Sequence, residues 1–251
     1  MDEYSMDYDV YAEKYAQTRW ALPWIANPLV SEAKHLPRQS TIVEIGCGTA
    51  NYIIAISKEF EQLHYKAFDI SEEMLRVARS RSNDINIEFQ IGNAESRFPY
   101  RDQECDMMFT VDVIHHIAAL DIFFAEALRV LKPGGRLLIV TDSEENIRRR
   151  SLTKFFPEIL QIELDRYPKL EELNQSAEVA GFIIHSSEKM EGHIDFTDDF
   201  ISALEKKCAS AMRIISQEAH KRGLSRVKVA QKKGEAWFSC YTLLKYDKLP
   251  E

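Results

Sequence analysis

Apolar residues along this chain follow two patterns, short continuous runs and longer stretches with helical spacing. The short runs predict buried strands at residues 42–45, 106–111 and 137–140. Residues 85–91 alternate as a strand does, and residues 64–69 are also predicted to form a strand. Between them, residues 50–60, 72–81 and 120–131 have the spacing of helices, and Ser71 is a suitable N-cap for the second of these. Strands that alternate with helices need crossover connections, so the pattern predicts a largely parallel sheet covered by helices.

The two ends of the chain do not follow this alternation of strands and helices. Tyr8, Tyr11 and Tyr15 form one stripe of a predicted helix over residues 5–17, and an apolar segment with prolines follows at 20–36. Beyond residue 141, a helix is predicted at 169–180, ended by Gly181, with strands at 182–190 and 236–246. The residues between these last two strands are predicted to be largely helical.

The most informative segment is TIVEIGCGTAN, residues 41–51. An apolar strand stops on Gly46 and Gly48 and a helix begins at once, which is typical of nucleotide-binding α/β units, where glycines let a ligand approach the backbone. Asp69 ends the next predicted strand, where a carboxylate can accept hydrogen bonds from a ribose diol. Asn51 stands where the dinucleotide pattern G-x-G-x-x-G has its third glycine, which disfavours a NAD-binding oxidoreductase.

The segment EIGCGTA, with Glu44 two residues before the first glycine, resembles motif I of the class I S-adenosylmethionine (SAM)-dependent methyltransferases. Three later segments resemble successive strands and loops of that family: IGNAESRFPY (91–100), CDMMFTVDVIHHI (105–117) and LKPGGRLLIVT (131–141). Many relatives carry Asp where this chain has Asn93. The resemblance covers roughly residues 40–145 and concerns fold and cofactor more than substrate.

The resemblance implies an α/β fold, a doubly wound and mostly parallel seven-stranded sheet, in a single domain over residues 1–251. Residues 37–143 would form the cofactor-binding core and residues 1–36 an N-terminal helical lid. The family commonly joins its last two strands closely, whereas residues 192–235 intervene here. Together with residues 144–168, they are expected to form a helical substrate cap inserted before the last strand.

SAM, with S-adenosylhomocysteine (SAH) as its product, is the cofactor that the resemblance implies. Asp69 would hold the ribose, Glu44 would orient the loop or meet the methionine end, and Arg19 would pair with the methionine carboxylate. Tyr8 and Tyr11 would pack over the pocket. The full set of expected cofactor-binding residues is Tyr15, Arg19, Glu44, Gly46, Cys47, Gly48, Asp69, Ile70, Met74, Asn93, Ala94, Glu95, Thr110 and Val111.

Methyl transfer from a sulfonium requires alignment and exclusion of water, so no metal site is expected. His115 and His116 are candidate general bases because imidazole titrates near neutral pH, and a packing role for both is the alternative. Asp112 and Asp142 lie near strand ends, but no third ligand stands at a recognisable spacing from them.

Composition places the chain among ordinary globular proteins, with 251 residues and a hydrophobic fraction of 45%. No apolar run approaches the ~20 residues needed to span a bilayer, and the acidic N-terminus has no apolar signal region. The four cysteines are scattered, as expected for reduced thiols. We therefore expect a cytoplasmic protein without membrane contact, as a monomer or homodimer.

The acceptor is the feature that the sequence determines least. A net charge of −8 argues against general attraction to nucleic acid, so methylation of an O or N atom of a small molecule is favoured. Residues 201–233 nevertheless contain nine Lys or Arg against two Glu, which leaves open an RNA methyltransferase that uses this basic cap. Against RNA, no aromatic residues are interleaved there, and the loop TVDV (110–113) lacks the Asn/Asp-Pro-Pro-aromatic motif of amino-group methylation. A non-catalytic SAM-binding regulator is the other alternative.

Overall fold

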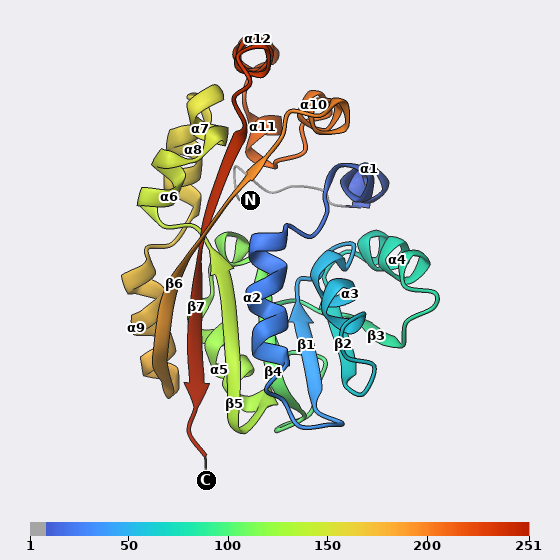
Figure 1. Ribbon diagram of the computed structural model, residues 1–251. Coiled ribbons are helices and arrows are strands. Elements are labelled where there is room, and N and C mark those ends of the chain that lie inside the picture. Colours follow the sequence, from blue (N-terminus) through green and yellow to red (C-terminus); the bar gives the residue numbers. More distant parts are fainter. Residues whose placement is uncertain (1–8, 251) are drawn as a thin grey trace.

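A seven-stranded sheet forms the centre of the computed structural model, which describes residues 9–250 (Figure 1). The strand order is β3-β2-β1-β4-β5-β7-β6; β7 runs antiparallel to both of its neighbours, and the other pairs are parallel. This confirms the predicted doubly wound, mostly parallel sheet. The strands are β1 (Thr41–Ile45), β2 (His64–Asp69), β3 (Ile87–Ile91), β4 (Cys105–Val111), β5 (Leu131–Thr141), β6 (Phe182–Ile194) and β7 (Trp237–Lys248).

Helices cover both faces of this sheet, because successive strand residues point to opposite sides. On β5, Leu138 and Val140 belong to one apolar cluster, with residues of α2 (Pro23–Ala33), α3 (Asn51–Ser57) and α4 (Glu72–Arg81). Leu137 and Ile139 belong to a second cluster, with α5 (Leu120–Val130) and α9 (Leu170–Ala180). The sheet is therefore the middle layer of three.

Several predicted element bounds agree closely with the structure. β2 and α4 occupy the predicted residues, and the side chain of Ser71 caps α4 by accepting a hydrogen bond from the Met74 amide at 3.1 Å. At the N-terminus, the turn η1 (Asp9–Tyr11) leads into α1 (Ala12–Thr18), within the predicted helix. Tyr8, predicted to pack there, lies outside the described residues.

The last two strands are longer than predicted. β6 continues to Ile194 because it pairs along the whole of β7, up to the Ile194–Trp237 register. This long ribbon reaches beyond the rest of the sheet toward the helices at the top of Figure 1. Those helices are α6 (Glu144–Arg149), α7 (Ser151–Phe155), α8 (Ile159–Arg166), α10 (Asp198–Glu205), α11 (Ala211–Ile214) and α12 (Gln217–Lys232).

These upper helices have an apolar core of their own, separate from the two clusters on the sheet. We call it the upper core. Its buried members are Leu152, Phe155, Phe156, Ile159, Phe196, Phe200, Ile201, Leu204, Ala211, Met212, Ile215, Ala219, Val227, Ala230 and Trp237. Segments before β6 and after it thus fold together over the carboxyl ends of the parallel strands. Across residues 9–250, no helix combines the length and the apolar character that crossing a membrane would require.

Gly223 provides a test of packing in the upper core. A Cβ atom on this buried glycine of α12 would lie 2.1 Å from Cδ1 of Phe156, whose ring is itself fully buried. Gly→Ala in a helix ordinarily gains about 0.5–1 kcal/mol, but overpacking costs about 1–3 kcal/mol, so Gly223→Ala should lower the melting temperature. Exposed Ser225→Ala on the same helix is the control, and should leave it unchanged or slightly raised. A stabilised Gly223→Ala variant would show that α12 is not packed as described.

Candidate active site

A cavity of about 190 Å³ lies at the carboxyl ends of β1, β2, β3 and β4. On one side β1 pairs with β2, the next strand in the chain, and on the other side it pairs with β4. The strand order therefore reverses at β1, and the cavity lies at this point. Open α/β sheets bind ligands at this kind of position. We call it the first cavity.

The glycine turn after β1 forms one wall of the first cavity. Gly46 and Gly48 have φ angles of 64° and 52°, in the left-handed region that favours glycine. A Cβ atom on Gly46 would lie 2.7 Å from a methyl carbon of Val113. The turn therefore needs glycine both for its backbone conformation and for its close contact with the loop after β4.

Asp69, at the end of β2, is bonded to this turn. Its Oδ2 accepts a hydrogen bond from the Gly48 amide at 2.7 Å, and its Oδ1 accepts one from the Ser71 amide at 3.0 Å. Burial raises the pKa of Asp69, and these amide hydrogen bonds oppose that shift. Each carboxylate oxygen keeps a further lone pair, so Asp69 can hold the turn and still accept hydrogen bonds from a ligand.

Glu44, near the end of β1, connects the strand to the start of α3. Its Oε2 accepts a hydrogen bond from the Ile53 amide in the first turn of α3 at 3.1 Å. Burial raises the pKa of Glu44 well above its usual value. The side chain therefore satisfies an otherwise free helix-terminal amide while it also lines the first cavity.

The structure brings together all of the predicted cofactor-binding residues around the first cavity except Arg19 and Thr110. Thr110 is fully buried in β4, and its hydroxyl donates a hydrogen bond to the Ile45 carbonyl at 3.0 Å. Arg19 lies at the two cavities described below. Lining residues that the sequence reasoning missed are Asn51, Tyr52, Phe68, Gly92, Asp112, Val113 and Ile117. Of these, Asn51 could have been found from the sequence, because it occupies the place of the third glycine in the motif.

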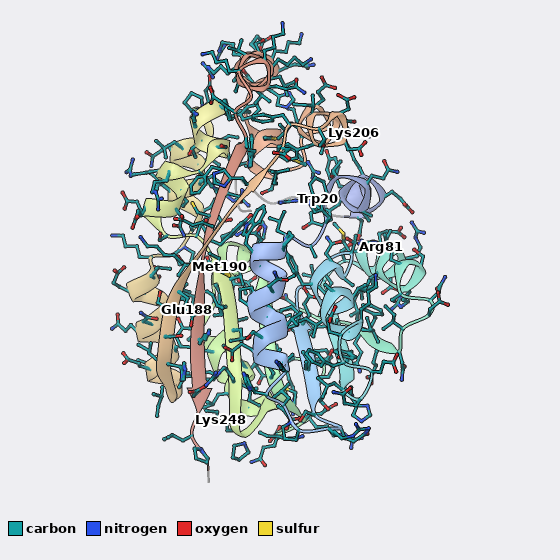
Figure 2. All side chains as sticks on the ribbon, viewed as in Figure 1. Trp20, Arg81, Glu188, Met190, Lys206 and Lys248 are labelled. Atoms are coloured by element: carbon teal, nitrogen blue, oxygen red, sulfur yellow. The ribbon has the colours of Figure 1, made fainter. Side chains whose placement is uncertain are left out.

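A second cavity of about 100 Å³ adjoins the first. The two share Tyr15, Asn51, Tyr52, Val111 and Asp112, so they meet at these side chains. The remaining wall is mostly apolar and comes from the upper helices, the start of β7 and the segment before α2. It includes Trp20, Phe200, Leu204, Met212 and Trp237. Trp20, labelled beside α1 in Figure 2, has its ring centroid 6.1 Å from that of Phe200.

A third cavity of about 70 Å³ is more polar and shares Tyr15, Arg19, Asp112, Arg150 and Tyr241 with the second. Arg150 is buried and forms ion pairs with Asp142 and Glu163. Burial raises the pKa of Asp142, while the neighbouring Arg150 opposes that shift. Within residues 9–250, no group of three or more His, Cys, Asp or Glu is arranged to hold a metal ion.

The two histidines face different surroundings. The His115 ring stacks on Tyr167 with centroids 4.3 Å apart and lines only the third cavity, whereas His116 lines both the first and the third. Burial and the nearby His116 hold the pKa of His115 well below its usual value. His115 is therefore neutral near pH 7.

Residues 37–248 match a family model described as a methyltransferase domain. The chain belongs to the class I SAM-dependent methyltransferase family. Among solved structures, this methyltransferase is similar to a putative methyltransferase from an antibiotic biosynthesis pathway of Anabaena variabilis. The TM-score is 0.69 with 22% identity, over 93% of this chain and 100% of that one.

Curated relatives of this methyltransferase act on different acceptors. The chain is 30% identical over 97 residues to a fatty-acid O-methyltransferase of Mycolicibacterium smegmatis, covering 39% of this chain and 35% of that protein. It is 28% identical over 187 residues to tRNA (carboxymethyluridine(34)-5-O)-methyltransferase ALKBH8 of Macaca fascicularis, covering 73% of this chain and 26% of that protein. The chain thus spans a minor part of each relative's length.

Asp69→Ala should weaken SAH binding by roughly ten- to a hundredfold, since charge-assisted hydrogen bonds are each worth about 1.5–3 kcal/mol. Isothermal calorimetry with SAH measures this, and a melting curve checks that the variant folds. Exposed Asp102→Ala, outside the three cavities, is the matched control and should bind as wild type does. Unchanged affinity in a folded Asp69→Ala variant would mean that another residue holds the ribose.

Proposed function

We propose that this protein transfers a methyl group from SAM to an oxygen or nitrogen atom of a small-molecule acceptor. The observation that carries the proposal is the junction of the first and second cavities at Tyr15, Tyr52 and Asp112. A cofactor in the first cavity would meet an acceptor in the second at these side chains. Family membership supports the cofactor, and the size of the mostly apolar second cavity, about 100 Å³, supports a small acceptor.

The first cavity has the groups that SAM requires. Asp69 would accept hydrogen bonds from the ribose hydroxyls, and the glycine turn leaves room for a ligand against the backbone. Ile70, 65% exposed at the end of β2, and Met74 offer apolar contact to a flat base. The methyl group arrives on a sulfonium, so the protein has chiefly to align the acceptor and exclude water.

The upper helices and the N-terminal segment would act as the substrate cap and lid. Phe200, Leu204 and Met212 from the cap, and Trp20 from the lid, line the second cavity. Within the described residues, the upper helices line no part of the first cavity, whereas Tyr15 of the N-terminal segment lines both cavities. This division supports a cap that selects the acceptor while the core binds the cofactor.

RNA methylation is the second candidate, because a tRNA methyltransferase aligns with 73% of the chain. Several cations of residues 201–233 are already engaged within the protein. Arg222 and Lys228 pair with Glu158 and Glu205, and Arg226 donates to the Phe155 carbonyl at 2.9 Å. Transfer of labelled methyl from SAM to metabolite pools, with and without RNA, separates the two candidates. Labelling of RNA alone would reverse the preference, and no transfer to either would favour the non-catalytic regulator.

Ala209→Trp tests the assignment of the second cavity. Ala209 lies between α10 and α11 and lines the second and third cavities but not the first. An indole there should fill the acceptor space and abolish transfer in the labelling assay, while SAH affinity stays within about threefold because the cofactor groups are untouched. Lys206→Trp, on an exposed position of the same connection (Figure 2), should retain transfer. Normal transfer by a folded Ala209→Trp protein would place the acceptor elsewhere.

The role of the histidines is tested by single-turnover rates with the acceptor that the labelling assay identifies. Burial holds the pKa of His115 well below its usual value, which makes its imidazole a weak proton acceptor. We expect His115→Ala and His116→Ala each to retain rates within about tenfold of wild type, as for packing residues. A loss of about 10²–10⁴-fold in either variant would instead identify the general base.

A further inference from the structure

Asp112 stands at the junction of all three cavities, a position shared with Tyr15. It directly follows β4, and its amide donates a hydrogen bond to the Val140 carbonyl on β5 at 3.1 Å. The junction of the first and second cavities is where the proposed cofactor and acceptor would meet. Asp112 is the carboxylate placed at that junction.

The backbone of Asp112 is held in an unfavourable conformation. Its φ angle is 57°, in the left-handed region that few residues other than glycine and Asn or Asp enter. The next residue, Val113, packs against Gly46, which leaves the loop little freedom. Such conformations persist where the surrounding structure enforces them, and they cluster at functional sites.

The Asp112 carboxylate is only partly satisfied by the protein. Burial raises the pKa of the Asp112 carboxyl, and nearby Arg19 and a hydrogen bond with Tyr167 oppose that shift. Its Oδ1 is buried without a hydrogen-bond partner in the described part of the chain. A buried acceptor without a partner is unfavourable because it has lost its hydrogen bond to water. A ligand that donates a hydrogen bond to Oδ1 would remove that cost.

Charges around Asp112 favour an acceptor that is itself neutral. Arg150 is already paired with Asp142 and Glu163, and Glu163 also lies 3.5 Å from Arg166. Arg213, on the third cavity, lies over the Tyr11 ring at 4.0 Å. Arg19 lines the second and third cavities together with Asp112, and within residues 9–250 it forms no ion pair. A carboxylate placed at the junction would meet the negative charge of Asp112 directly.

The second cavity, which Asp112 also lines, has an apolar wall that suits a flat apolar body. Phe200 stands edge-on to Trp237 with centroids 5.3 Å apart, and Trp20 stands edge-on to Phe200 at 6.1 Å. Leu204 and Met212 complete this apolar wall. Aromatic rings so arranged offer faces and edges to another ring.

We propose that Asp112 binds the hydroxyl or amine of an aromatic acceptor and takes up its proton during methyl transfer, an assignment that rests on the proposed function. The acceptor oxygen or nitrogen forms the new bond to the methyl carbon as the carbon–sulfur bond breaks, and the electron pair of that bond stays on sulfur. The acceptor proton passes to the Asp112 carboxylate and later to water. Carboxylate acceptors are disfavoured because they carry no proton for Asp112.

Binding of two matched probes in the presence of saturating SAH tests this assignment. Calorimetry with 2-naphthol and 2-naphthoate compares a hydroxyl with a carboxylate on the same ring system. Wild-type protein should bind 2-naphthol at least tenfold more tightly. In Asp112→Asn, which can still accept a hydrogen bond but carries no charge, the preference should fall to within threefold. Labelled methyl transfer to 2-naphthol should fall at least a hundredfold in this variant.

The matched control is Asp195→Asn, an exposed acid outside the three cavities, which should keep the wild-type preference and transfer rate. Equal binding of both probes by wild-type protein, tighter binding of 2-naphthoate, or binding of neither would overturn the assignment. These outcomes are measured on the wild-type protein, so they do not depend on whether a variant folds. Failure of SAH to bind would instead contradict the proposed function, so the two are distinguishable.

Discussion

The site depends on one interaction, the hydrogen bond from the Gly48 amide to the Asp69 carboxylate at 2.7 Å. It joins the glycine turn after β1 to the end of β2, and the second oxygen of Asp69 binds the Ser71 amide just before α4. One buried carboxylate therefore fixes two loops and one helix start around the first cavity. Because the carboxylate is fixed on two sides, it presents its remaining lone pairs to a ligand without losing entropy on binding.

In the proposed function, cofactor binding and acceptor binding depend on separate apolar cores. The two clusters on the sheet position the glycine turn, Asp69 and the loop after β4, whereas the upper core positions Phe200, Leu204, Met212 and Trp237. The long ribbon of β6 and β7 connects the two regions, since Trp237 begins β7 and also belongs to the upper core. Changes to the upper core can therefore alter the second cavity while the first keeps its geometry.

Buried charge is concentrated between these regions, where Arg150 pairs with Asp142 and Glu163. Removing one partner of such a network is strongly destabilising, by about 3–5 kcal/mol, because it leaves an unpaired buried charge. The network links the end of β5 to α8 and balances the charge of Arg150 beside the second and third cavities. Arg19 and Arg150 both act on the Asp112 carboxylate, so the charge at the junction depends on this network as well as on Asp112.

The sequence by itself determined the features that depend on neighbouring residues. The bounds of β2 and α4, the Ser71 cap, the glycine turn and the position of Asp69 all follow from local pattern and short spacing. The upper core, the place of Arg19 at the second cavity and the exposure of Asp112 to all three cavities were decided by the tertiary structure alone. The physical reason is that side chains at the second cavity, from Trp20 to Tyr241, come from segments more than two hundred residues apart. The local sequence pattern does not predict which of these side chains come into contact, because their contacts depend on how distant elements pack together.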